Sequence, residues 1–153
     1  MGKRIFRYTT KLVRESSQIY EVENKQITDS TTAMEFCRRV FGQILQDSPT
    51  EKMVVIPLNT KNIVIGYEII TSGTLDSSLV HPREIFRPAI LANASGILLC
   101  HNHPSGDSTP SPQDISATRR LDKSAEILGI DIVDHIVVGA CPEDAAHSIR
   151  EIM

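Results

Sequence analysis

The sequence predicts an α/β domain in which a mixed sheet is flanked by helices. Three observations indicate this fold class: segments with apolar residues at helical spacing alternate with short apolar runs, two of these runs lie close enough to form a hairpin, and a third run leads directly into a helical pattern. The chain has 153 residues, of which 41% are hydrophobic, so we expect a single compact domain with a substantial core.

Residues 1–27 are expected to form an N-terminal arm that precedes the main domain, which we place at residues 28–153. Apolar and polar residues alternate at 11–15 and at 19–22, which predicts two short strands, and their dense charges favour an edge position. The basic residues of the first ten positions are interpreted as part of an ordinary terminus and not as a nucleic-acid-binding arm.

A first long helix is predicted to begin beside Asp29 and Ser30, either of which can cap the amides of its first turn. Apolar residues then recur at helical spacing, at Ala33, Phe36, Cys37, Val40, Phe41, Ile44 and Leu45. Cys37 is therefore assigned to the core and not to a nucleophilic role. Pro49 ends the helix, because proline has no amide hydrogen with which to continue it.

The apolar run at residues 53–58 predicts a buried strand, and residues 63–71 predict a second strand that forms a hairpin with it. A helix follows, with Pro82 in its first turn. Pro88 lies inside this helical pattern and predicts a kink. Gly96 is interpreted as the C-terminal turn that closes the helix.

The next apolar run, residues 96–100, predicts a buried strand that ends at two histidines, His101 and His103. Residues i and i+2 of a strand point to the same side, so both imidazoles can face one ion. Asp114 lies in the first turn of the helix that begins near Ser111, where the helix dipole favours an anion. Two imidazoles and a carboxylate leave one tetrahedral position open, which is typical of catalytic zinc sites.

The helical pattern at residues 115–128 is closed by Gly129, and residues 130–138 predict a further strand. Asp134 and His135 interrupt the apolar run of that strand. We interpret His135 as a residue that either packs near the first metal site or makes a hydrogen bond within the sheet, in preference to a ligand of a second metal ion.

The order of residues at the proposed site resembles that of a known family. A His-x-His pair, seven residues, a serine, two residues and an aspartate form the motif of the JAMM (MPN-plus) metalloproteases, which this sequence carries at His101, His103, Ser111 and Asp114. The surrounding segments 79–86 and 101–107 resemble the RadC branch of that family, and the similarity extends from about residue 28 to residue 139.

The resemblance implies the JAMM/MPN fold, which is related in architecture to the cytidine deaminases. It also implies that His101, His103 and Asp114 bind zinc. RadC-like chains usually end in a small strand and a turn, whereas residues 143–153 of this chain are predicted to depart from that pattern.

The resemblance further implies a glutamate that acts as general acid and base and a serine that assists the oxyanion. Glu51, shortly after a proline and before the first predicted strand, matches the position of this glutamate, and Glu68 is the alternative. From the local sequence pattern alone, either residue would be interpreted as a solvent-exposed carboxylate of a strand. Ser111 is the oxyanion donor, a helix cap, or both. His81 is either a residue close to the substrate or a structural residue of its helix.

The function predicted from these residues is a zinc-dependent metallopeptidase or isopeptidase-like hydrolase, with a peptide or isopeptide as substrate. The alternative is a non-catalytic RadC-like module with a role associated with DNA repair or mobile elements. The net charge of −3 weighs against direct binding of nucleic acid. Zinc deaminases carry a PCxxC pair, which this sequence lacks, so deamination is not expected.

Composition also predicts the compartment. No run of 18 apolar residues is present, so no membrane span is expected, and the N-terminus lacks the pattern of a secretory signal. Three cysteines, an odd number without paired spacing, favour a reducing environment. A cytoplasmic location is therefore predicted.

Overall fold

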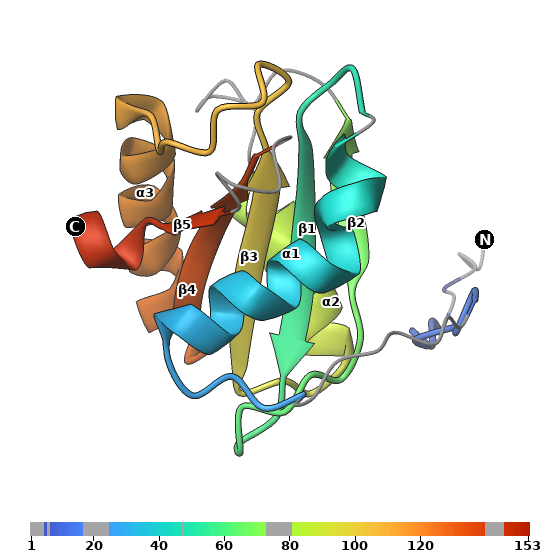
Figure 1. Ribbon diagram of the computed structural model, residues 1–153. Coiled ribbons are helices and arrows are strands. Elements are labelled where there is room, and N and C mark those ends of the chain that lie inside the picture. The colour runs from blue at the N-terminus through green and yellow to red at the C-terminus, as the bar shows by residue number, and fades with distance from the viewer. Residues whose placement is uncertain (1–4, 6, 17–24, 47, 73–80, 140–145) are drawn as a thin grey trace.

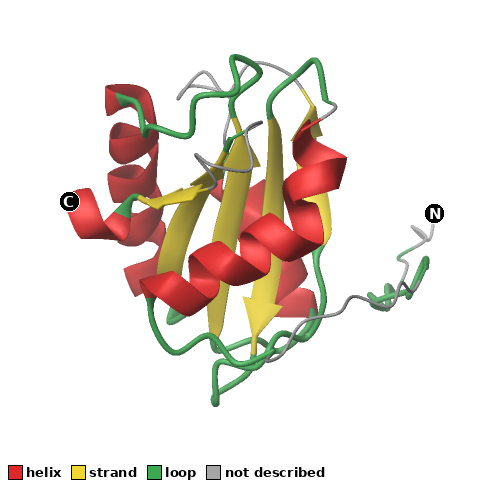
Figure 2. Ribbon diagram, viewed as in Figure 1, coloured by secondary structure: helices red, strands yellow, loops and turns green. Residues whose placement is uncertain are grey.

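The computed structural model describes residues 5, 7–16, 25–46, 48–72, 81–139 and 146–153. Within them, a mixed sheet with the strand order β2-β1-β3-β4-β5 is covered by helices on both faces (Figures 1 and 2). The elements are α1 (Ser30–Gln46), β1 (Lys52–Leu58), β2 (Glu68–Ser72), α2 (Pro82–Leu91), β3 (Gly96–Asn102), α3 (Pro112–Leu128), β4 (Asp131–Val138), β5 (Ala146–Ser148) and a 3₁₀ turn, η1 (Arg150–Ile152). This architecture confirms the predicted fold class.

The connection from β3 through α3 to β4 determines where the functional residues meet. β3 and β4 are parallel neighbours, and β1 runs antiparallel to β3 on the other side. A parallel crossover returns the chain along the face of the sheet, so α3 begins at the edge where β3 ends. The C-terminal end of β3 and the N-terminus of α3 are therefore close together (Figure 1).

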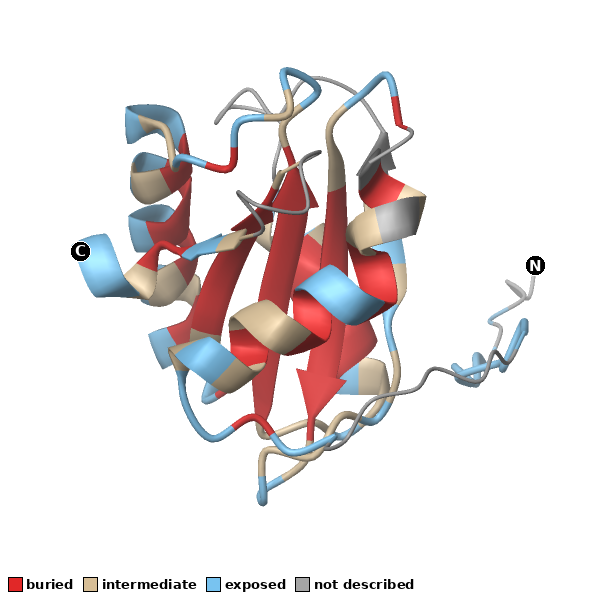
Figure 3. Ribbon diagram, viewed as in Figure 1, coloured by how far each residue is buried: buried red, intermediate tan, exposed pale blue. Residues whose placement is uncertain are grey.

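Alternating residues of the central strands fill two separate cores, which explains why β1 and β3 are buried on both faces (Figure 3). On one face, α1 packs against the even-numbered residues of these strands, such as Val54 and Cys100. On the other face, α2 and α3 pack against odd-numbered residues, such as Val55 and Leu99. Cys37 is fully buried in the α1 core, as predicted, and burial raises the pKa of its thiol.

The helix ends follow the predicted chemistry. A side-chain oxygen of Asp29 accepts a hydrogen bond from the amide of Thr32 at 2.8 Å, so Asp29 caps α1. Ser111 caps α3, and Gly129 ends it in the left-handed conformation, with φ of 65°. The helix α2 begins at Pro82, as predicted.

Gly96 does not close α2, contrary to our prediction. The left-handed residue after α2 is Asn93, with φ of 51°, and Gly96 is the first residue of β3. A Cβ atom at position 96 would lie 3.1 Å from the carbonyl oxygen of Asp131 and 3.3 Å from a methyl group of Val133. Glycine is therefore favoured at this position, because a side chain here would press against the neighbouring strand.

The strand β4 contains a bulge that determines which way His135 faces. Ile97 pairs with Ile132, whereas Leu98 pairs with Asp134, so Val133 is the inserted residue. Without it, strict alternation from Ile132 would turn His135 toward α1. With it, His135 lies beside Leu99 on the face that α2 and α3 cover. The strand predicted at residues 130–138 is confirmed as β4, and Asp134 and His135 both lie within it.

Two strand predictions were wrong, and one short strand was not predicted. Residues 11–15 are exposed and lie outside any strand, while the predicted strand at 19–22 falls outside the described residues. The strand β2 begins at Glu68 and not at residue 63, because Ile63 forms only an isolated bridge to Gln26, and Val64 forms only an isolated bridge to Leu58, the last residue of β1. The C-terminal segment does form a small strand and turn, β5 and η1, which we did not predict.

The division of the chain at residue 27 stays a prediction. Ile27 itself is buried in the α1 core. No helix among the described residues is both long and apolar enough to cross a membrane.

Candidate metal centre

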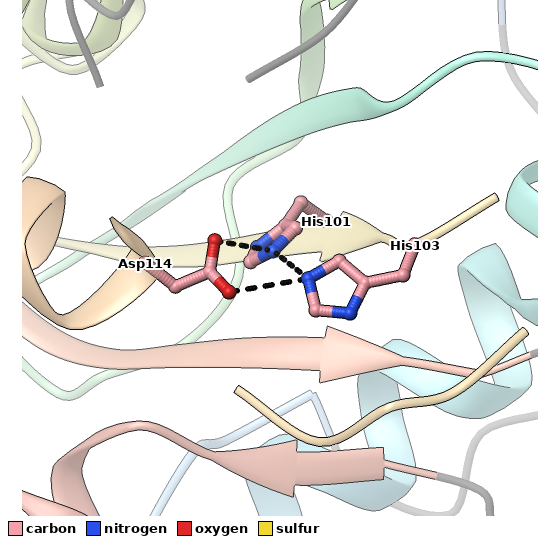
Figure 4. A group of neighbouring side chains, drawn as sticks. All are labelled: His101, His103 and Asp114. Atoms are coloured by element: carbon pink, nitrogen blue, oxygen red, sulfur yellow. Dashed lines mark hydrogen bonds and ion pairs between the residues drawn. The ribbon is translucent and has the colours of Figure 1, made fainter. Parts of the chain in front are cut away.

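Three side chains converge at the end of β3 (Figure 4). His101 is the penultimate residue of β3, His103 follows the strand, and Asp114 is the third residue of α3. His101 is fully buried and Asp114 is 7% exposed, while the side chain of His103 is 14% exposed, so His103 is the member of the centre most accessible to solvent. His101 shares the face of Leu99, which places it under the N-terminus of α3 and explains why a crossover helix can supply the third group.

The distances between the three side chains are short enough for one ion to contact all of them. The two Nε2 atoms of His101 and His103 are 3.1 Å apart. The two carboxylate oxygens of Asp114 lie 3.2 Å from the Nε2 atom of His101 and 3.1 Å from that of His103. One ligand atom from each residue lies within 4.8 Å of the others.

The hydrogen bonds of His103 assign its tautomer. Its Nδ1 atom is 2.8 Å from the backbone carbonyl oxygen of Asp107. A carbonyl oxygen can only accept, so Nδ1 carries a proton and donates it. In the neutral ring the Nε2 atom then has no proton, and its lone pair points toward Asp114 and His101.

A buried chain of hydrogen bonds assigns the tautomer of His101 in the same way. The hydroxyl of Thr118 donates to the backbone carbonyl of Asp114 at 2.8 Å, so its oxygen must accept from Nδ1 of His135, also at 2.8 Å. Burial holds the pKa of His135 well below its ordinary value, so this ring is neutral. Its Nε2 atom therefore accepts from Nδ1 of His101 at 2.9 Å, which leaves the Nε2 atom of His101 without a proton.

The donor set fits a metal ion. Two nitrogen lone pairs and a carboxylate face one another at about hydrogen-bond distance, an arrangement that a shared cation or an added proton must stabilise. In the metal-free protein a proton can take this role at pH values below the pKa of His103, which the hydrogen bond to Asp114 raises. Burial raises the pKa of Asp114, but hydrogen bonds from the imidazoles of His101 and His103, when a proton is shared among the three groups, lower it by more, so the pKa of Asp114 lies well below the usual range. His101, His103 and Asp114 could therefore hold a metal ion.

Ser111 and Asp114 form a capping box. The hydroxyl oxygen of Ser111 accepts from the amide of Asp114 at 3.2 Å, and the backbone amide of Ser111 donates to a carboxylate oxygen of Asp114 at 2.7 Å. The hydroxyl also donates to that same oxygen at 2.6 Å. The capping role of Ser111 is confirmed. Its hydroxyl also orients the carboxylate that faces both histidines, while its role as oxyanion donor stays a prediction.

Of the two predicted glutamates, Glu51 lies closer to the centre. Glu51 directly precedes β1, and the alternation of that strand from Met53, which pairs with His101, would put Glu51 on the face of the two histidines if it continued by one residue; the charge of Glu51 also contributes to the raised pKa of His103. Glu68 pairs with Val55, farther along β1 and one strand farther out. Its carboxylate is 3.1 Å from the guanidinium of Arg87, with which it forms an ion pair.

The other two histidines that we singled out differ in their surroundings. His135 touches His101 directly, in line with the prediction that it packs near the metal site. His81 is exposed at the start of α2. Within the described segment 81–139, its side chain makes no hydrogen bond to the backbone amides of the first helical turn.

Our sequence reasoning missed several residues that support the site. Thr118 lies four residues after Asp114, one helical turn along the same face, a spacing that could have identified it. His147, on β5, is 2.8 Å from the hydroxyl of Ser108, which is fully buried in the loop between the histidines and α3. The sequence carries no local signal for this contact, because the partners are 39 residues apart.

Comparison with known proteins identifies relatives of the chain. The sequence model of the family described as RadC-like JAB domain matches residues 27–152. Over 89 residues the chain is 57% identical to a UPF0758 protein of Clostridium kluyveri, which covers 58% of this chain and 39% of that protein. Over 95 residues it is 53% identical to UPF0758 proteins of Staphylococcus haemolyticus and Desulforamulus reducens, covering 62% of this chain and 42% of each relative.

The chain spans about two fifths of the length of these relatives, and their names state no activity. The family model, in contrast, covers most of the chain and includes all three residues of the candidate centre. The resemblance drawn from the motif is thereby confirmed. The chain belongs to the RadC-like JAB domain family.

Proposed function

We propose that this protein is a zinc-dependent hydrolase of the metallopeptidase or isopeptidase type. The observation that carries the proposal is the convergence of the Nε2 atoms of His101 and His103 on the carboxylate of Asp114. Nitrogen and carboxylate ligands in this number favour zinc, and three protein ligands are typical of catalytic zinc sites. When bound, the ion would supply an activated water and polarise the substrate carbonyl.

The chain's own residues would supply the proton transfers. Glu51, on the face of the two histidines, is the proposed base that accepts a proton as water adds to the amide carbonyl carbon. It then delivers this proton to the leaving nitrogen as the C–N bond breaks, which yields a carboxylic acid and an amine. Ser111 is the proposed donor to the negative charge that develops on the carbonyl oxygen.

The buried surroundings support this assignment. His101 is fully buried and fixed by His135, and His103 is fixed by the Asp107 carbonyl. Ligands held in one orientation need little rearrangement when the ion binds. The substrate class, a peptide or isopeptide, is the one that the family resemblance implies, and an amide of this kind offers a leaving nitrogen that Glu51 can protonate.

Elemental analysis tests the metal first. We expect one zinc per chain in protein purified without an affinity tag or added metal, and its loss in a His101→Ala/His103→Ala variant. His81→Ala is the matched control, because it removes an exposed histidine from the start of α2 and should leave the zinc in place. Native protein that takes up no zinc at neutral pH would overturn the proposal.

Activity is tested next on pooled peptide and isopeptide-linked substrates, with release of amine as the signal. Glu51→Gln should abolish release while retaining zinc, because it removes the base but no ligand. Glu68→Gln should leave release unchanged, since that carboxylate pairs with Arg87. The reverse result would move the catalytic role from Glu51 to Glu68.

A further inference from the structure

Asn102 lies between the two histidines in sequence but faces the opposite side of the sheet. By strand alternation it shares the face of Leu98 and Cys100, which belong to the α1 core, and it is 3% exposed. Its carboxamide oxygen accepts the amide of Lys52 at 2.8 Å, and its carboxamide nitrogen donates to the carbonyl of Thr50 at 3.3 Å. Both ends of this buried side chain therefore bind the backbone on either side of Glu51.

These two bonds occur where the regular pairing of the strands ends. The β1–β3 ladder runs from Leu58 paired with Gly96 to Met53 paired with His101. Glu51 precedes the first residue of β1 and so lies outside this ladder. The side chain of Asn102 continues the connection from β3 to this segment in place of a further pair of backbone bonds.

We propose that Asn102 is a positioning residue that holds Glu51 on the face of the metal centre. This inference rests on the proposed function, in which Glu51 is the acid and base. A carboxamide suits the task because it offers one acceptor to Lys52 and one donor to Thr50. Aspartate would place a second oxygen against the Thr50 carbonyl, and leucine would leave both backbone groups without this partner.

Ser48 is a second support of the same segment. Its hydroxyl donates to the Thr50 carbonyl at 2.8 Å, so this carbonyl has two donors. The amide of Lys52, in contrast, donates to the carboxamide oxygen of Asn102 at 2.8 Å, which is the shorter of the two hydrogen bonds that Asn102 makes to this segment. The exchange rate of that amide is therefore the direct measure of the Asn102 contact.

The first experiment measures amide hydrogen exchange in Asn102→Ala, with Asn102→Ser as the milder variant if the alanine protein does not fold. We expect exchange at Lys52 to rise at least tenfold. Asn59→Ala is the matched control, because the Asn59 side chain accepts two backbone amides, from Lys61 and Ile63, at the other end of β1. It should speed exchange in that turn and leave Lys52 unchanged.

The second experiment follows the pH midpoint of the visible absorption of the Co²⁺ form. Removing the Glu51 charge should lower this midpoint by about half a unit or more, because a nearby negative charge opposes loss of a proton at the ion. Asn102→Ala should shift it in the same direction, and Asn59→Ala should not. In a Glu51→Gln background, Asn102→Ala should cause no further shift.

The outcomes separate this inference from the function on which it rests. Native protein that binds no Co²⁺ overturns the proposed function, and the role of Asn102 with it. A midpoint that moves in Glu51→Gln but not in Asn102→Ala overturns only the positioning role. An Asn102→Ala shift of equal size with and without Glu51 also overturns it, since the effect would then not pass through Glu51.

Discussion

The Nε2 atom of His135 accepts a hydrogen bond from Nδ1 of His101 at 2.9 Å, across the parallel pair of β3 and β4. This bond keeps the other nitrogen of His101 free of a proton and directed at His103 and Asp114. Partners of this kind typically contribute 10- to 100-fold to metal affinity. We therefore predict that His135→Leu retains the three ligands but weakens zinc binding by about that factor, measured by competition with a chromophoric chelator.

The His135→Gln variant is the control for this prediction. Its side-chain oxygen can still accept from Nδ1 of His101, whereas leucine cannot. Zinc affinity in His135→Gln should therefore lie nearer to that of the native protein. Equal losses in both variants would show that the packing of the imidazole ring matters and the hydrogen bond does not.

The contact between His101 and His135 also shows what the sequence could not predict. His101, His103 and Asp114 are related by short spacings on one strand and the helix that follows it, so local geometry was enough to bring them together. The orientation of His135 depends on a single inserted residue, Val133, which reverses every later side chain of β4. No pattern in the apolar run of β4 marks where such a bulge lies.

In the fold as well, features set by local sequence could be predicted, whereas features set by pairing with a distant strand could not. The long helices α1 and α3 were predictable because their apolar spacing and caps are local. The strand β5 has three residues and is defined by its pairing with β4, so its sequence alone is too short to identify it. Gly96 was misassigned because glycine suits both a left-handed turn and a close approach between strands, and only the neighbouring strand distinguishes the two.

The two roles of Ser111 can be separated by mutation. Ser111→Ala removes the helix cap and should lower the free energy of unfolding by about 1 kcal/mol, while glycine at the same position costs only a few tenths. If the hydroxyl also stabilises the oxyanion, both variants should lose a similar, roughly 100-fold or greater, part of kcat. Unfolding by denaturant and turnover of the substrate found in the screen provide the two measurements. Activity that follows stability across the pair would leave Ser111 as a cap alone.

Zinc binding should strengthen as the pH rises. The hydrogen bond to Asp114 raises the pKa of His103 above its ordinary value of 6.5. Zinc binding must displace the proton that the protonated ring carries on its Nε2 atom. In the metal-free protein the raised pKa contributes stability that is full below pH 6.5 and is lost as the pH rises through the raised value. The zinc-bound protein does not lose this contribution, because its His103 binds the ion in place of a proton. The difference in Tm between the zinc-bound and the metal-free protein should therefore widen as the pH rises through the raised pKa of His103.

Calorimetry at several pH values between about 6 and 8.5, with and without zinc, measures this difference. His103→Ala is the control, because it removes both the raised pKa and one ligand. A Tm difference that narrows with rising pH in the native protein would contradict the assignment of His103 as a ligand that exchanges a proton for the ion.

Two glycines should respond to alanine with opposite signs. At Gly96 the new methyl group would lie 3.1 Å from the Asp131 carbonyl and 3.3 Å from Val133, so Gly96→Ala should cost about 1–3 kcal/mol as β3 and β4 are forced apart. At Gly42, inside α1, the methyl group would meet nothing within 4 Å, so Gly42→Ala should stabilise the protein by roughly 0.5–1 kcal/mol. Denaturant unfolding of both variants gives the two values.

Because Val133 is the bulge residue that turns His135 toward His101, Gly96→Ala should also weaken zinc binding, whereas Gly42→Ala should not. A loss of stability in Gly96→Ala without any change in zinc affinity would show that the orientation of His135 does not depend on the close approach of β3 and β4 at this end of the sheet.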